Sequence, residues 1–118
     1  MIVQEWKSIG TVRINISTTD TLATVIVDVI KEKTAEQRFE PGDALIWNLC
    51  VHKDYRGERY GRQMLAEAEL RAKQYGAKVA YLEWDGRDSE KWVLDWYKRN
   101  GYEEVEFGQD YELLKKEL

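Results

Sequence analysis

The sequence predicts an α/β fold built on one mixed β-sheet, and three observations support that fold class. The first half of the chain is rich in β-branched runs separated by turn residues. The following part alternates an apolar run, an amphipathic helical pattern, a second apolar run and a second helical pattern. Two short apolar runs around Gly108 close the chain. This order predicts a mixed sheet with helices packed on it, in one domain over residues 1–118.

The first half is expected to form strands. Apolar residues alternate with polar ones over 11–16, which predicts a half-buried strand, and residues 2–6 are expected to add a short edge strand. The β-branched run 22–30 follows turn residues and predicts the second arm of an antiparallel hairpin. The polar segment 31–40 is expected to be a solvent-exposed loop.

A strand, a helix and a second strand are predicted next. The run 44–51 is apolar except for Asn48, which is typical of a strand covered on both faces. A helical pattern covers 61–75, with Gly76 as its C-terminal cap. The apolar face of this helix carries Leu65, Ala68, Ala72 and Tyr75. Because a helix separates 44–51 from the run 79–84, these two strands are expected to pair in parallel through a right-handed crossover.

A second helix and a hairpin complete the predicted fold. The helix is expected to begin after an N-cap at Asp88 or Ser89 and to end at Asn100 and Gly101. One face of it carries the apolar residues Trp92, Val93, Trp96 and Tyr97. The runs 102–107 and 111–114 flank the turn residues Gly108, Gln109 and Asp110, which predicts a closing hairpin.

The composition argues against several functional classes. At 118 residues the chain is long enough for one hydrophobic core without disulfides or a structural metal. Its formal net charge of −4 disfavours general nucleic-acid binding. A single cysteine, Cys50, and a single histidine, His52, suggest neither a disulfide nor a metal site, and suit a reducing compartment. We see no signal peptide and no bilayer-spanning run, so we expect a cytoplasmic protein without a membrane partner.

The stretch from Leu49 to Arg62 is the leading candidate for a binding site. It joins the end of an apolar strand to the start of a helix, and it contains four cations and two glycines: Lys53, Arg56, Arg59, Arg62, Gly57 and Gly61. A helix N-terminus presents backbone N–H groups without intrahelical partners and a partial positive charge, which together favour a phosphate or pyrophosphate. The alternative is a solvated turn in which the glycines serve only the backbone.

Residues 44–102 resemble the core of the GNAT superfamily of acyl-coenzyme A-dependent N-acetyltransferases. In that family a buried strand ending in Val leads to a short loop and then to Arg/Gln-x-x-Gly-x-Gly/Ala at a helix start. Here Val51 ends the strand, Arg56 and Gly61 fit the first and last motif positions, and Arg59 stands where the middle glycine is usual. Further along, Tyr97 and the Gly101-Tyr102 pair match the family, whereas Glu90 and Val93 replace its usual Asn and Ala.

The resemblance implies an acetyl-CoA-dependent N-acetyltransferase that moves an acetyl group to a primary amine of a small molecule, peptide or protein. It implies that the pyrophosphate of coenzyme A is held at the motif by Arg56, Gly57, Glu58, Arg59, Tyr60, Gly61 and Arg62. The strand end from Leu49 through Cys50 to Val51 would bind the pantetheine amides, and an N–H of Leu49 or Cys50 would polarise the thioester carbonyl. Tyr97 would be the general acid that protonates the sulfur. No metal is implied.

The general base is left unassigned. Leu45 and Trp47 occupy the strand positions where some family members carry Glu or His. Glu83 and Asp85, acting through a water, and His52 are the remaining candidates. Cys50 has no evident activating partner, so it is not expected to act as a nucleophile.

The acceptor side differs from the usual family pattern. Family members place one or two helices between the first two strands, and residues 7–10 leave no room for them. The acceptor site is therefore either open and suited to a peptide or protein amine, or completed by a second subunit in a homodimer. The acidic residues of 83–90 favour a cationic acceptor, although solvated loop charge explains them equally well.

The sequence is also compatible with two other functions. One is a non-catalytic GNAT-like module that binds an acyl-CoA or a partner protein, which the departures at Arg59 and Glu90 would allow. The other is an unrelated nucleotide- or phosphate-binding domain. The sequence lacks a Walker-type or dinucleotide fingerprint, which counts against that reading.

Overall fold

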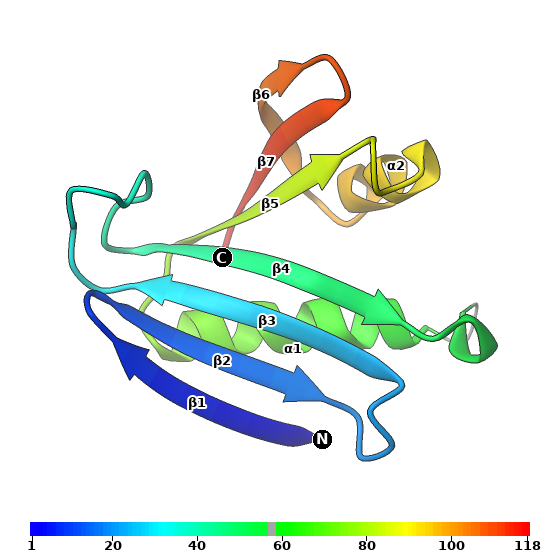
Figure 1. Ribbon diagram of the computed structural model, residues 1–118, viewed down its shortest axis with the longest axis horizontal. Coiled ribbons are helices and arrows are strands. Elements are labelled where there is room, and N and C mark those ends of the chain that lie inside the picture. Colours follow the sequence, from blue (N-terminus) through cyan, green and yellow to red (C-terminus); the bar gives the residue numbers. More distant parts are fainter. Residues whose placement is uncertain (57–58) are drawn as a thin grey trace.

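The computed structural model describes residues 1–56 and 59–118, and within them it contains a seven-stranded sheet and two α-helices (Figure 1). The strands are β1 Ile2–Ser8, β2 Thr11–Ser17, β3 Ala23–Ile30, β4 Asp43–Val51, β5 Val79–Asp85, β6 Glu103–Gly108 and β7 Tyr111–Glu117. The helices are α1 Tyr60–Gln74 and α2 Lys91–Arg99, with a short 3₁₀ turn at Lys53–Tyr55. The predicted element order is confirmed, including the edge strand at the N-terminus. Neither helix is long and apolar enough to cross a membrane, as judged over the described residues.

The sheet has two antiparallel halves joined by a short parallel seam. Its strand order is β1-β2-β3-β4-β5-β7-β6, and every neighbouring pair is antiparallel except β4 and β5. Those two strands pair in parallel, as predicted, but only through Asp43↔Val79, Ala44↔Ala80 and Leu45↔Tyr81. Beyond Leu45 and Tyr81 they diverge, and Figure 1 shows β5 turning away from β4. We call the space between the two strands beyond this last pair the gap.

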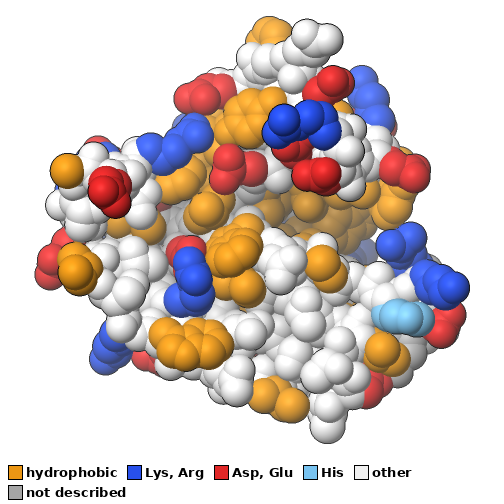
Figure 2. Space-filling view, in the orientation of Figure 1, with side chains coloured by type: hydrophobic (Ala, Val, Ile, Leu, Met, Phe, Trp, Pro, Cys, Tyr) orange, Lys and Arg blue, Asp and Glu red, His pale blue; other side chains and the backbone are white. Residues whose placement is uncertain are grey.

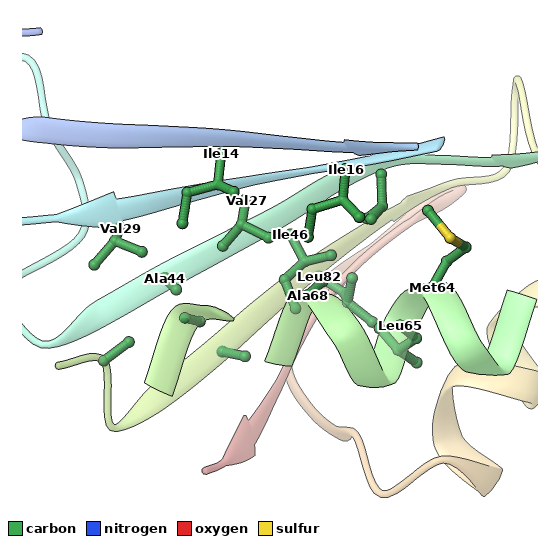
Figure 3. Packing of buried hydrophobic residues seen from close by; sticks show 14 of the residues in the cluster. Ile14, Ile16, Val27, Val29, Ala44, Ile46, Met64, Leu65, Ala68 and Leu82 are labelled. Atoms are coloured by element: carbon green, nitrogen blue, oxygen red, sulfur yellow. The ribbon is translucent and has the colours of Figure 1, made fainter. Parts of the chain in front are cut away.

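Both helices pack on the same face of the sheet. Val27 and Ile46 of the sheet pack with Leu65 and Ala68 of α1 in one hydrophobic core (Figure 3). Leu94 of α2 belongs to the same core and is almost completely buried. The apolar face predicted for the first helix is confirmed at its three inner positions, while Tyr75 is only partly buried.

The opposite face, which we call the open face, carries no helix of the described chain. It is formed by the strand residues whose side chains point away from α1, and Figure 2 looks onto it. The β3–β4 connection covers part of it, since Phe39 is buried against Tyr81 with ring centroids 4.9 Å apart. The loop expected over 31–40 is therefore anchored by one buried aromatic side chain.

The prediction that 44–51 is covered on both faces was wrong. Ala44 and Ile46 are buried under α1, whereas Trp47, Asn48 and Cys50 are exposed. The reason is that the second half of β4 pairs with β3 on one side but borders the gap on the side of β5. Trp and Cys are apolar enough to resemble core residues in the sequence, yet here they lie on the surface.

Two details of the second helix also differ from expectation. The N-cap of α2 is Glu90, without a side-chain capping bond, and the amides of Asp88 and Ser89 bond instead to the Asp85 carbonyl. Trp92 is 53% exposed, and the fully buried residue of α2 is Leu94. The sequence contains a wide apolar face, and only packing against the sheet decides which part of it is buried.

Candidate active site

The gap opens because β4 contains a bulge. Asn48 adopts a positive φ of 54°, and the β3–β4 register shifts between Thr24 and Ile26, so that two residues of β4 face one residue of β3. A bulge bends and twists its strand, and this one lies where the pairing with β5 has ended. The polar interruption seen in the sequence is therefore the residue at which β4 leaves its neighbour, because Asn tolerates the left-handed conformation better than other non-glycine residues.

A cavity of about 710 Å³ lies on the helix side of the gap, between β4, the start of α1 and α2. Figure 2 shows the hollow between β4 and the β5–α2 region, with hydrophobic side chains at its base. Nine of the predicted site residues line it: Leu49, Cys50, Val51, Arg56, Arg59, Tyr60, Gly61, Arg62 and Tyr97. Gly57 and Glu58, the other two predicted residues, lie outside the described part of the chain. Residues from four separate segments thus meet at one cavity.

The N-terminus of α1 forms the cationic end of the cavity. Arg56, Arg59 and Arg62 all line it, and no carboxylate of the described residues lies within 4.0 Å of their side-chain nitrogens. Arg56 donates a long hydrogen bond of 3.4 Å from Nε to the Val51 carbonyl. Three guanidinium groups without acidic partners at a helix N-terminus suit a multiply charged anion.

Arg59 is the N-cap of α1 and adopts φ 69° and ψ 9°, the left-handed region that glycine enters without strain. This backbone conformation explains why glycine is usual at the motif position that Arg59 occupies. A methyl group added at Gly61 would meet Trp96 at 3.6 Å and Val51 at 3.7 Å, which is ordinary contact. The last motif position therefore has room for alanine, consistent with the Gly/Ala alternatives of the motif.

Tyr97 lies at the other end of the cavity, close to Cys50. It comes from α2, is partly buried against the core, and its ring lies 5.7 Å from that of Trp96. Burial raises the pKa of Tyr97 above its usual value near 10, and the Cys50 thiol adds to this effect. The hydroxyl consequently stays protonated at neutral pH, as a proton donor must.

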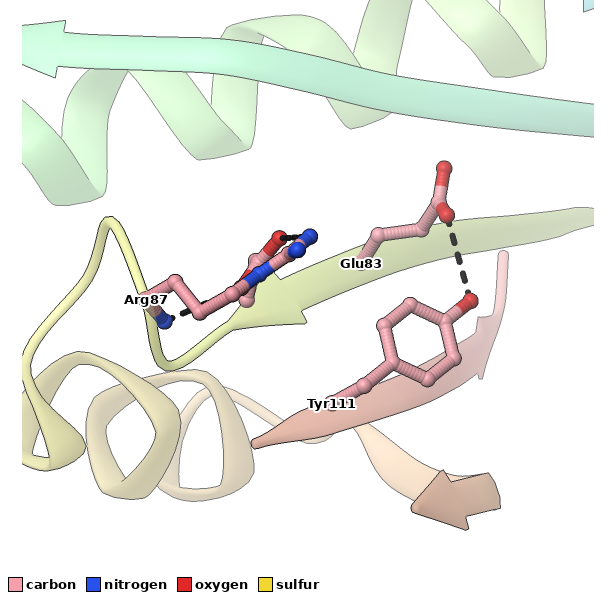
Figure 4. A network of polar contacts seen from close by, with 4 residues as sticks. Glu83, Arg87 and Tyr111 are labelled. Carbon is pink, nitrogen blue, oxygen red and sulfur yellow. Dashed lines mark hydrogen bonds and ion pairs between the residues drawn. The ribbon is translucent and has the colours of Figure 1, made fainter. Parts of the chain in front are cut away.

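The three candidate bases have different surroundings. None of the three lines the cavity. His52 is the N-cap of the 3₁₀ turn, and its Nδ1 accepts from the Asp54 amide at 3.2 Å. Asp85 is bound by Arg87 through both carboxylate oxygens, which lowers the pKa of Asp85 to about 2 (Figure 4). Glu83 accepts one hydrogen bond, from the Tyr111 hydroxyl at 3.1 Å. Of the three, Glu83 alone combines a position beside the gap with a carboxylate not engaged by a cation.

Several cavity residues were missed from the sequence as site residues. These are Asp88, Ser89, Glu90, Trp92, Val93 and Trp96, all from the β5–α2 connection and α2. Glu90 is the best defined of them, because its carboxylate accepts from the Trp92 indole at 3.1 Å and its carbonyl accepts from the Trp84 indole at 3.1 Å. The signal that could have identified this wall was the aromatic stripe of α2, which we assigned to packing.

Comparisons with known proteins agree with this geometry. The family model of the acetyltransferase (GNAT) domain matches residues 4–104. No curated protein matches the chain by sequence. A protein described as an acyl-CoA N-acyltransferase of Klebsiella pneumoniae is similar in structure, with a TM-score of 0.71 at 17% identity over 96% of this chain and 76% of that one.

Two further solved structures are similar. An acetyltransferase from Bacillus cereus has a TM-score of 0.67 at 19% identity, over 98% of this chain and 74% of that one. The PaiA N-acetyltransferase from Thermoplasma acidophilum, in complex with coenzyme A, has a TM-score of 0.67 at 17% identity, over 90% of this chain and 60% of that one. At these identities the likeness establishes the fold.

Proposed function

This chain belongs to the GNAT acetyltransferase family, and we propose that it transfers an acetyl group from acetyl-CoA to a primary amine of a small molecule, peptide or protein. One observation carries the proposal. A single cavity beside the gap is lined by Tyr97 and by three arginines that have no acidic partner among residues 1–56 and 59–118, which are Arg56, Arg59 and Arg62. An acyl-CoA needs both features, since it has charged phosphates at one end and a thioester at the other.

The residues of the cavity fit coenzyme A. Arg56, Arg59 and Arg62 would hold its pyrophosphate together with backbone N–H groups of the first turn of α1. Beyond Leu45 the edge of β4 that faces β5 pairs with no strand of the described residues, so its backbone groups near Leu49 and Cys50 would be available to the pantetheine amides, while the Val51 carbonyl accepts from Arg56. The site thus offers a phosphate-binding end and a strand edge to one extended ligand.

The chemistry follows from the positions of the groups. An N–H of Leu49 or Cys50 would polarise the thioester carbonyl, at which negative charge develops as the amine attacks. The C–N bond forms, the C–S bond breaks, and Tyr97 would donate its proton to the departing sulfur. The proton lost by the amine nitrogen passes to water, and water returns a proton to the Tyr97 phenolate, so no net proton is gained or lost.

Calorimetric titration with acetyl-CoA and with free coenzyme A tests the binding half of the proposal. We expect both to bind, because they share the pyrophosphate and pantetheine that the cavity would hold. If neither binds at millimolar concentration, the proposed function is wrong.

Thiol release from acetyl-CoA with a panel of amines and peptides tests the catalytic half. Acceptor-dependent release supports an N-acetyltransferase. Tight coenzyme binding with no transfer to any amine of the panel would instead support the non-catalytic acyl-CoA-binding module.

A further inference from the structure

Two side chains flank the gap on the open face, at equivalent places on its two strands. The last β4–β5 pair is Leu45↔Tyr81, and side chains of a strand return to the same face every second residue. The next open-face position is therefore Trp47 on β4 and Glu83 on β5. Both lie about 6.6 Å beyond the last pair along their strands, where the strands no longer hydrogen-bond. The gap thus has an aromatic border and an acidic border.

Trp47 is held in place by a buried carboxylate. Its Nε1 donates to Oδ2 of Asp28 at 3.0 Å, and Asp28 is only 9% exposed. Arg13 donates to the same carboxylate at 2.8 and 3.1 Å, and its guanidinium lies 5.0 Å from the indole centroid. Both partners come from β3 and β2, on the side of β4 away from β5. The indole is therefore fixed from the β2 and β3 side, with Arg13 against its ring, and the residue remains 37% exposed.

The carboxylate of Glu83 forms no ion pair with a cation of the described residues. In Figure 4 its side chain extends from β5 toward β4, and one carboxylate oxygen accepts from the Tyr111 hydroxyl. Among residues 1–56 and 59–118, no Lys or Arg nitrogen lies within 4.0 Å of this carboxylate. Arg38 forms its ion pair with Glu106 and donates to the Tyr111 hydroxyl, and it acts on Glu83 only through a weaker electrostatic attraction without contact. The Glu83 carboxylate can therefore bind the cationic group of a ligand.

We infer that Trp47 and Glu83 form a two-sided binding site for the ammonium group of the acceptor, at the entrance of the gap on the open face. An aromatic face and a carboxylate both attract a cation, and neither favours a neutral alcohol or an acid. The acceptor class is then an amine that is cationic in solution and reaches the gap from the face opposite the helices. Arg13 and Asp28 are positioning residues that hold the indole. The inference rests on the proposed function for the presence of an amine at this place.

Indole ¹H–¹⁵N signals provide a direct test that needs no turnover. The protein, with and without coenzyme A, is titrated with n-butylammonium and, separately, with n-butanol, and a Trp47→Phe variant assigns the Trp47 signal. We expect the ammonium to shift that signal and the alcohol to leave it in place. Equal shifts with both ligands, or a shift with neither, would overturn the inference.

A matched pair of variants tests the acidic border. Glu83→Gln should weaken butylammonium binding by about fivefold or more, because it removes a charged acceptor at an exposed site. Glu117→Gln removes the same charge from the same face, at the far end of β7 from the gap, and should leave the affinity unchanged. Equal affinities in the two variants would contradict the inference. Since the titration without coenzyme A depends on neither coenzyme binding nor acetyl transfer, its result is separate from the fate of the proposed function.

Discussion

The arginines on the two sides of the gap differ in whether they form ion pairs. On the helix side, three arginines at the start of α1 lack acidic partners among the described residues. On the open face, Arg13 pairs with Asp28, Arg38 with Glu106, and Arg87 with Asp85. Pairing neutralises a cation and fixes its position, whereas an unpaired cation stays available to a ligand. We infer from this contrast that the helix side suits an anionic ligand, and that Glu83, a carboxylate beside the gap without an ion pair in the described structure, suits a cation.

We expect the largest effect on coenzyme A affinity when the charge of an arginine at the cationic end of the cavity is reversed. Arg56→Glu or Arg62→Glu should weaken coenzyme A binding by about ten- to a hundredfold, since each replaces a charge-assisted phosphate contact with repulsion. Calorimetry measures the affinity. Lys73→Glu is the control, because Lys73 lies about 20 Å away at the other end of α1 and has the same change in charge. Unchanged affinity in both arginine variants would argue against the pyrophosphate placement.

Removing the proposed acid should lower the rate strongly while leaving binding intact. Tyr97→Phe is expected to reduce kcat by about a hundredfold, the lower end of the usual contribution of a general acid. Because burial raises the pKa of Tyr97 and the group works while protonated, wild-type activity should lose this contribution only as the pH rises above about 10. Tyr75→Phe, which removes only the hydroxyl that contacts Glu5 at the far end of α1, is the control.

A wild-type rate for Tyr97→Phe at every pH would rule out the acid role. The affinity of this variant for coenzyme A is expected to stay within about twofold of wild type, since the ring and its packing are kept. A large loss of affinity would show that the hydroxyl binds the ligand and does not act in proton transfer alone.

On the open face, the buried carboxylate of Asp28 should contribute more to the free energy of unfolding than the exposed ion pair of Arg38 and Glu106. Asp28→Ala leaves the Arg13 guanidinium and the Trp47 indole without their acceptor and should lower the free energy of unfolding by about 2 kcal/mol. Asp28→Asn, which can still accept from the indole, should lower it less. Glu106→Ala removes an exposed ion pair, so a change below about 0.5 kcal/mol is expected in the same urea titrations.

We expect the smallest effect, on the free energy of unfolding, at Arg59. Its left-handed backbone affects stability, whereas its charged side chain would affect coenzyme binding. Arg59→Gly removes left-handed strain and should raise the free energy of unfolding by about 0.5 kcal/mol, because part of the relief is offset by the greater freedom of the unfolded chain. Arg62→Gly, inside the helix, should lower it by about 1 kcal/mol. Both variants should weaken coenzyme binding through loss of a cation. A destabilised Arg59→Gly protein would contradict our explanation of that position.

Much of the fold follows from local patterns in the chain. The alternation in β2, the β-branched run of β3 and the glycine after α1 are properties of neighbouring residues, and the order of elements implied the parallel pairing of β4 and β5. The prediction of a phosphate site at residues 49–62 is equally local, since it rests on a strand end, glycines and cations before a helix.

Other features depend on contacts between distant residues. The exposure of Trp47 and Cys50 arises because the bulge at Asn48 and the divergence of β5 remove the neighbour that the apolar run implied. The bonds from Arg13 and Trp47 to Asp28 join residues 15 and 19 positions apart, so they exist only once the β2–β3–β4 register is set. The placement of Glu83 opposite Trp47 likewise depends on which pair is the last of the parallel seam. The sequence by itself therefore determined the strands, the helices and the cation-rich turn between β4 and α1, because these depend on the identity and periodicity of neighbouring residues. Only the tertiary structure decided where the sheet opens, because that depends on pairing and twist accumulated across separate strands.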